Sequence, residues 1–168
     1  LDHSVDLVKV EKDLQQRVVS QLKRLEKDLF EKLTDTDPAS IPTRYQAARM
    51  EKLFSQTQST IQSTFAGIKS DHVEYLTDFS KVEAEANIMI PNRVLGASVF
   101  STSLSAKQLK EICKDTLIQG APSAEWWKRM ETKTAQKFSD EVRQGVLSGE
   151  STNQIVQRIR GKSTGKYK

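Results

Sequence analysis

The sequence predicts an all-α protein. Apolar residues recur at steps of three and four over long stretches, only 7 Gly and 4 Pro occur among 168 residues, and 29% of the residues are charged against 36% that are hydrophobic. Few helix breakers and a thin apolar fraction are typical of long amphipathic helices, which bury one stripe and leave the rest in water. A chain of this length has room for one ordinary domain or for two small helical layers.

The first predicted helix spans residues 6–33. Its apolar positions follow steps of 3, 4, 4, 4, 3, 4 and 4, and they are Leu7, Val10, Leu14, Val18, Leu22, Leu25, Leu29 and Leu33. This spacing is that of a helix. The polar segment behind it contains Pro38 and Pro42, which favour a break. A long helix with one apolar stripe needs a partner, either within the chain or in another subunit.

Two further helices are expected before residue 91. The first covers residues 43–68, and its predicted inward positions are Ala47, Met50, Phe54, Ile61, Phe65 and Ile68. The second covers residues 71–88, and its predicted inward positions are Val73, Leu76, Phe79, Val82 and Ala86. Gly67 either separates the two helices or lets one helix continue with a bend. We expect Pro91 to end the second of them.

A shorter helix is expected after an apolar connector. Residues 94–100 are predicted to be irregular, and Ser105 with Gln108 then has the spacing of a capping box. The helix is expected to run to about residue 118, with Gly120 just beyond its end. Its predicted apolar positions are Leu109, Ile112 and Leu117.

Two helices are expected at the C-terminal end. The longer one spans residues 125–147, with Ser123 as its cap and Gly149 just past its end. Ser151 begins a second capping box, with Gln three residues later, before a short helix at 155–159.

The expected organisation has four parts. They are an antiparallel unit of three long helices at residues 1–90, a connector at 91–104, a smaller helical unit at 105–161 and a basic tail at 162–168. No segment approaches the roughly 18–20 apolar residues of a membrane span. The start has neither an initiator Met nor the apolar core of a signal peptide. We therefore expect a soluble piece of a longer protein, without a membrane contact.

The sequence shows no catalytic or metal-binding constellation. His3 and His72 are far apart, and neither has Cys, Asp or His beside it at the spacing of a metal site. A Gly-rich phosphate loop and a Ser/His/Asp set are both absent. We expect a packing role for the single cysteine, Cys113, because lone cysteines are commonly buried. The prediction is a non-enzyme without metal or cofactor that binds other macromolecules.

Trp126 and Trp127 are candidate protein-contact residues. Neighbours on a helix point about 100° apart, so both cannot face a narrow core equally. Either one lies in the core while the other is half covered, or the pair anchors a partner protein, as Trp does at many interface hot spots.

The positive charge is concentrated at the C-terminal end. From Ser151 onward the chain has five basic residues and no acidic one, and the overall charge of +4 leaves 4 − 5, or about −1, for the first 150 residues. The candidate nucleic-acid-binding residues are Arg158, Arg160, Lys162, Lys166 and Lys168. This tail is either only solvated, or it contacts nucleic acid or an acidic protein surface. A nucleic-acid contact would be made to phosphates, without sequence specificity.

Residues 124–161 resemble the closing region of the phage head-morphogenesis family, the Mu F-like minor capsid proteins. The family pattern is an amphipathic helix that ends in Ile/Val-x-x-Gly-Val/Leu-x-x-Gly-x-Ser-x-x-x-Ile, followed by a basic finish. The matching positions are Val142, Gly145, Val146, Gly149, Ser151, Ile155 and Ile159. The resemblance covers about forty residues, and the long helices upstream are compatible with it in type only.

The resemblance implies a role in virion assembly. Members of the family are few-copy components inside the phage head, associated with the portal and with packaged DNA, and important for infectivity. For this chain it implies docking on the portal protein and other head proteins, non-specific contact with packaged double-stranded DNA, and assistance in DNA packaging or ejection. The expected location is the head interior, and the host cytoplasm during assembly. Self-association into a homo-oligomer is compatible with it.

Two other interpretations remain open from the residues. The stripe from Leu7 to Leu33 on its own also predicts a coiled-coil adaptor or scaffold of a cellular complex. A third interpretation is a helical fragment of a toxin or enzyme whose active domain lies elsewhere.

Overall fold

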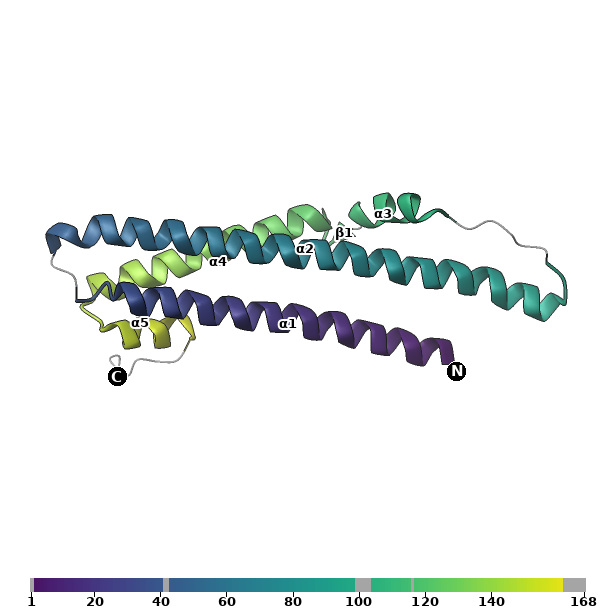
Figure 1. Ribbon diagram of the computed structural model, residues 1–168, viewed down its shortest axis with the longest axis horizontal. Helices are drawn as coiled ribbons and strands as arrows, with labels where there is room; N and C mark the ends of the chain where they lie inside the picture. Colours follow the sequence, from purple (N-terminus) through teal and green to yellow (C-terminus); the bar gives the residue numbers. More distant parts are fainter. Residues whose placement is uncertain (1, 41–42, 99–103, 116, 162–168) are drawn as a thin grey trace. The chain divides into compact units, whose positions relative to one another are not determined.

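The long helices predicted from apolar spacing are present, and the all-α fold class is confirmed. The structure is a computed structural model that describes residues 2–40, 43–98, 104–115 and 117–161, with side chains from residue 11 onward except those of 43 and 44. Its elements are α1 Asp2–Thr36, α2 Thr43–Leu95, α3 Ala106–Lys114, β1 Leu117–Ile118, β2 Ala121–Pro122, α4 Ser123–Leu147 and α5 Thr152–Ile159 (Figure 1).

The chain forms two compact units, and neither is continuous in sequence. Unit 1 contains Leu1–Val18 and Ala66–Trp127, and unit 2 contains Val19–Phe65 and Lys128–Lys168. The division expected at residue 90 does not follow these units. Prolines and glycines mark where helices end, but a unit is defined by which helix segments pack together, and α1, α2 and α4 each contribute to both.

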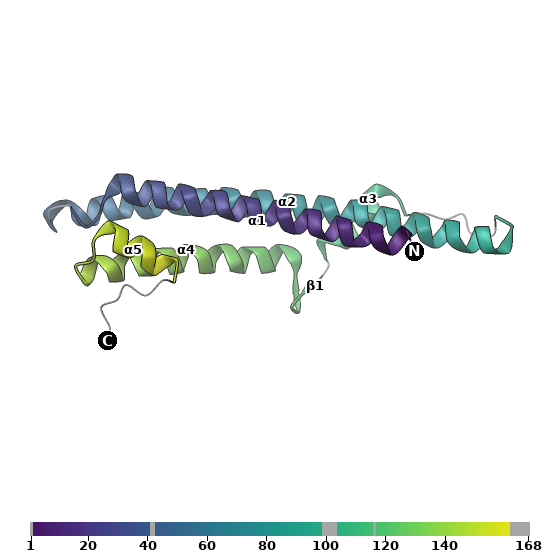
Figure 2. The same ribbon diagram turned by 90° about the horizontal axis from the view of Figure 1, so that it is seen from below.

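The core of unit 2 is built from four helices. Figures 1 and 2 show α4 lying along α1 and α2, with α5 folded back beside α4. The buried apolar side chains are Leu25, Leu29 and Leu33 of α1, Leu53, Ile61 and Phe65 of α2, Phe138 and Val142 of α4, and Ile155 of α5. The C-terminal half of the predicted α1 stripe therefore finds its partner within the chain.

A threonine occupies one position of the buried stripe of α2. The apolar spacing favoured Phe54, which is half-buried, and missed Leu53, which is fully buried. Thr57 lies one turn further and is also buried. Its hydroxyl donates to the backbone oxygens of Leu53, at 2.8 Å, and Phe54, at 3.0 Å. Because these bonds satisfy the hydroxyl inside the helix, Thr57 packs in the core without an unpaired polar group.

Helix α2 decides an alternative that the sequence left open at Gly67 and corrects the expected end at Pro91. It is one helix across Gly67, and it also passes through Pro91 to end at Leu95. A proline inside a helix removes one hydrogen bond to the carbonyl four residues earlier. That residue is Asn87, which is exposed. Water can bond the carbonyl there, so the helix is not broken, and the expected three long helices are two.

Helix α3 begins as predicted and ends earlier. The Ser105 hydroxyl accepts from the Gln108 amide and the Gln108 side chain accepts from the Ser105 amide, which completes the capping box. Cys113 is buried, as expected, and its Sγ lies 3.5 Å from the Ser80 hydroxyl of α2. The helix stops at Lys114.

A short hairpin follows α3 where the sequence predicted more helix. Strands β1 and β2 pair antiparallel, with Ile118 opposite Ala121. Gln119 and Gly120 form the two-residue turn, both with positive φ, of 51° and 79°. Type I′ hairpin turns require this backbone at both central positions. Gly120 is therefore a turn residue of the hairpin and not a residue just past a helix end.

Five positions that were predicted to face inward are exposed; Leu22 of α1 and Ala47 of α2 belong to unit 2, and the other three belong to unit 1. Val82 of α2 and Ile112 of α3 are about half exposed, and Leu117 of β1 is mostly exposed. A helix-period stripe predicts a face, but only a neighbouring element can cover it. No described element of unit 1 covers these three side chains.

Candidate functional site

The residues that carry the family resemblance meet in one place, the α4–α5 corner of unit 2, defined as residues 142–160. Helix α4 ends in a Schellman motif: the amide of Glu150 donates to the Gly145 oxygen at 2.9 Å, and that of Gly149 to the Val146 oxygen at 3.1 Å. Gly149 has φ +66°, which favours glycine. Ser151 then caps α5 through a second capping box with Gln154, as predicted.

Gly145 allows α5 to approach α4 closely. A Cβ placed on Gly145 would lie 2.5 Å from the Cγ1 of Ile155, closer than any side chain tolerates. Ile155 and Val142 are both fully buried beside it. Val146 and Ile159 flank them half-buried. Every position of the pattern thus has a folding role, as a close approach, a left-handed turn, a cap or a core side chain.

Arg158 is held inside the corner. Glu150 is 4% exposed, and its carboxylate accepts two bonds from Arg158, from Nε at 2.9 Å and from Nη2 at 2.5 Å. The Nη1 of Arg158 lies 3.8 Å from Glu141. The bidentate geometry compensates for the burial of the carboxylate. Arg158, which the sequence offered as a phosphate ligand, is a structural ion-pair residue.

Arg160 also has an intramolecular partner, but a more exposed one. Its Nε donates to Glu26 of α1 at 2.9 Å, and its guanidinium lies 4.6 Å from the centre of the Phe30 ring. Both charged side chains remain more than two-fifths exposed. The other three candidate nucleic-acid-binding residues, Lys162, Lys166 and Lys168, lie outside the described residues.

Asp37 joins the end of α1 to the start of α5. Its carboxylate accepts a hydrogen bond from the hydroxyl of Thr152, the first residue of α5, which is buried. Hydrogen bonds from Thr152 and then from Ser40 lower the pKa of Asp37 below its ordinary value. This contact links residues more than one hundred positions apart and could not be found from local spacing.

Trp126 and Trp127 lie near the start of α4 and are both half-buried. Their rings are perpendicular, with centroids 4.7 Å apart. Trp126 Nε1 donates to the Gln119 side chain at 3.3 Å, and Trp127 Nε1 to Nδ1 of His72 at 3.5 Å. Burial lowers the pKa of His72. Each indole nitrogen therefore has a partner inside unit 1, while part of each ring stays accessible.

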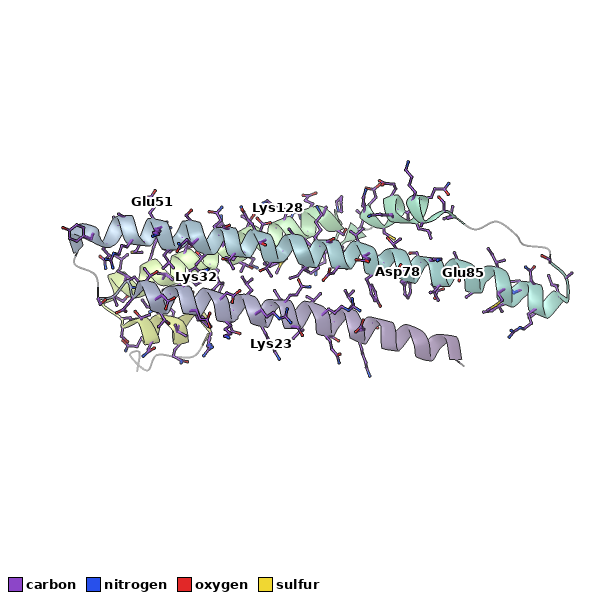
Figure 3. The ribbon with its side chains drawn as sticks, viewed as in Figure 1. Lys23, Lys32, Glu51, Asp78, Glu85 and Lys128 are labelled. Carbon is purple, nitrogen blue, oxygen red and sulfur yellow. The ribbon has the colours of Figure 1, made fainter. Side chains whose placement is uncertain are left out.

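Unit 1 has exposed apolar side chains at the α2 end, defined as residues 82–95. These side chains are Val82, Met89, Ile90, Val94 and Leu95. Val94 is 80% exposed. Figures 1 and 2 show α2 continuing past the N-terminus of α1, which leaves this end of the helix without α1 beside it. Glu85 marks the region in Figure 3.

The described residues contain no group of three or more His, Cys, Asp or Glu side chains arranged to hold a metal ion. In the same part of the chain, no helix is both long and apolar enough to span a membrane. No protein family, curated protein or solved structure matches the chain. The features that bear on function are therefore the corner and the α2 end.

Proposed function

We propose that this chain is a minor capsid protein of the head-morphogenesis type, which docks inside the phage head on the portal and assists DNA packaging or ejection. No reaction is assigned to it. The observation that carries the proposal is the α4–α5 corner. All seven positions of the family's closing pattern occupy one folded element, as two glycines, a helix cap, two fully buried and two half-buried apolar side chains.

The α2 end supports a docking role. Soluble proteins rarely expose contiguous apolar patches of more than a few hundred Å², and larger ones commonly mark interaction sites. Five large apolar side chains lie exposed within fourteen residues of one helix, at 82–95. Ile90 and Val94, four residues apart on this helix, lie on one face and can act as anchors in a groove on a partner. We assign the portal or another head protein as that partner.

The ion pairs of Arg158 and Arg160 change which residues we assign to the DNA contact. Arg158 and Arg160 already pair with carboxylates of the same chain. Binding DNA through them would require those pairs to break, and for Arg158 this would remove the bidentate partner of a buried carboxylate. The proposed phosphate contacts are therefore Lys162, Lys166 and Lys168. Three contacts give weaker and less salt-dependent binding than the five expected from the sequence.

The test is direct binding to purified portal protein from the same phage, with and without nuclease. We expect binding that survives nuclease and that weakens at least tenfold in an Ile90→Asp, Val94→Asp variant, because buried charges oppose docking. Ser59→Asp, at an exposed site on the same helix, is the matched control. Helicity measured by circular dichroism should be the same in all three proteins.

The outcomes also separate this function from the adaptor alternative. A coiled-coil adaptor would self-associate through α1 and would not bind the portal protein. Most of the α1 stripe in unit 2 is already buried, although Val19 and Leu22 are about two-fifths exposed. Self-association without portal binding, abolished by Val19→Asp and Leu22→Asp and untouched by changes at the α2 end, would favour the adaptor.

A further inference from the structure

Helix α4 presents one basic side to water. Between Glu125 and Asp140, the exposed residues of this helix are four basic and two neutral polar ones, with no acidic and no apolar residue among them. All of them belong to unit 2. We call this set the α4 face, and its members are Lys128, Arg129, Thr132, Lys133, Gln136 and Lys137. The first of them is labelled in Figure 3.

The α4 face consists of two rows along the helix. Side chains four positions apart lie on the same side of a helix, so residues 128, 132 and 136 form one row, and residues 129, 133 and 137 form the next. Every residue of the second row is a cation, and like charges at this spacing destabilise a helix. Neither Lys133 nor Lys137 forms an ion pair with a residue that the structure describes. An anion from outside the chain would relieve this repulsion.

The neighbouring helix α2 brings no acidic side chain beside the first row. A groove of about 310 Å³ separates the two helices there, and the lining residues that α2 contributes are all uncharged. The two acidic lining residues come from α4 itself, and each has a basic neighbour on the same helix. Glu131 is bonded to Lys128 at 2.6 Å, and Asp140 lies 3.8 Å from Arg143. The charge beside the face is therefore not reversed by the elements packed against it.

The exposed side of α1 shows what a solvated helix surface usually looks like. Lys23 and Lys27 are also exposed and four positions apart, but Glu26, Asp28 and Glu31 are exposed between and beside them. Lys27 lies 3.6 Å from Glu31. Mixed charge of this kind is typical of a helix face that meets only water. The α4 face lacks the mixture, so it fits a partner that supplies the negative charge.

The residue types of the α4 face favour a nucleic acid over an acidic protein. Protein–protein interfaces are rich in aromatic side chains and poor in Lys, whereas this face has three lysines and no exposed apolar residue. DNA-binding surfaces are more polar and much more positive. Thr and Gln side chains also donate to phosphate oxygens, beside Arg and Lys. Because the face has no aromatic side chain on which bases could stack, a duplex fits it better than a single strand.

We propose that the α4 face binds the phosphate backbone of double-stranded DNA without reading its sequence. At 1.5 Å per residue the face is about 14 Å long, over which one strand of a duplex presents about four phosphates. The choice of DNA rests on the proposed function, and the face adds a folded surface to the tail lysines assigned there. The inference does not depend on docking to the portal.

The test is a titration of the full chain with a short fluorescent DNA duplex of mixed sequence, followed by anisotropy at several salt concentrations. Glutamine replaces lysine in each variant, because its helix propensity is close to that of lysine. The test variant is Lys133→Gln, Lys137→Gln. The matched control, Lys23→Gln, Lys27→Gln, removes the same charge at the same spacing from α1. A third variant removes the tail charges by Lys162→Gln, Lys166→Gln and Lys168→Gln.

We expect the α4 variant to bind the duplex at least fivefold more weakly at low salt, and the control to change by less than twofold. The slope of log affinity against log salt should fall by about two in the α4 variant, because each lost phosphate contact removes roughly 0.9. The same loss should appear in the background of the tail variant. In the native chain, the duplex should protect Lys133 and Lys137 from acetylation more than Lys23 and Lys27.

Equal losses in the α4 variant and the α1 control would overturn the proposal, because they would reflect net charge alone. A loss confined to the tail variant would also overturn it, while the DNA contact of the proposed function would stand. Binding of poly-glutamate as tightly as the duplex would assign the face to an acidic protein instead. A native chain that does not bind DNA would overturn both DNA contacts, whereas docking to the portal is measured separately and without DNA.

Discussion

The α4–α5 corner and the α2 end both contain residues that are unusual in a helix. The two regions differ in whether other residues of the chain surround them. In the corner, a glycine permits a close approach, another allows a left-handed turn, and a buried carboxylate is matched by an arginine. In the α2 end, a proline lies within the helix and large apolar side chains remain exposed.

This difference indicates that the corner stabilises the fold, whereas the α2 end is an exposed surface. Every special residue of the corner is satisfied by another residue of the same chain, so substitutions there should change stability. The large apolar residues of the α2 end are at least half exposed, so we expect substitutions there to change binding and leave stability nearly constant. Four predictions test this contrast, from the largest expected effect to the smallest.

The first prediction concerns the buried ion pair of the corner. Arg158→Ala should lower the free energy of unfolding by about 3–5 kcal/mol, because it removes the bidentate guanidinium from the buried carboxylate of Glu150. Urea denaturation followed by circular dichroism measures this. Arg160→Ala is the matched control, and it should cost at most about 1 kcal/mol because its pair with Glu26 is exposed. Equal losses in the two variants would contradict the distinction between them.

The second prediction concerns the crossing of α4 and α5. Gly145→Ala should lower the free energy of unfolding by about 1–3 kcal/mol, because its Cβ would overlap the side chain of Ile155. Adding Ile155→Ala, which removes both the Cγ1 and the Cδ1 that the new methyl group would meet, should cost less in the Gly145→Ala background than in the native chain. Additive losses in the double variant would show that the two residues do not compete for the same space.

The third prediction is a pH dependence in unit 1, where His72 accepts from Trp127. Burial lowers the pKa of His72 in the folded chain, so below about pH 6.5 the unfolded chain binds more protons. The contribution to stability is complete above the unfolded pKa and falls as pH drops through the folded value. His72→Gln should flatten this part of the stability profile between neutral and mildly acidic pH. A profile unchanged by that substitution would assign the dependence to other groups.

The fourth prediction is the smallest change in stability. Ile90→Ser and Val94→Ser, both in the α2 end, should each change the free energy of unfolding by less than about 0.5 kcal/mol, because at least half of each side chain is already in water. Ile155→Ala, in the corner, should by contrast cost about 2–5 kcal/mol. A large loss from either serine variant would mean that the α2 end is part of a core and not a free surface.

The sequence by itself determined the local features of this protein. Helix spacing predicted the long α1, capping-box spacing located the starts of α3 and α5, and Gly149 predicted the end of α4. Each of these depends on interactions between residues a few positions apart, which a linear pattern records.

Only the tertiary structure decided the rest. It joined the two expected helices into α2, placed a hairpin at Gly120, and paired Arg158 with Glu150 and Arg160 with Glu26. It also left Ser123 buried without a partner. Whether a proline ends a helix, or an arginine is free for a phosphate, depends on which groups surround it in space. Spacing along the chain determines on which face of a helix a side chain lies, but not which element packs against that face.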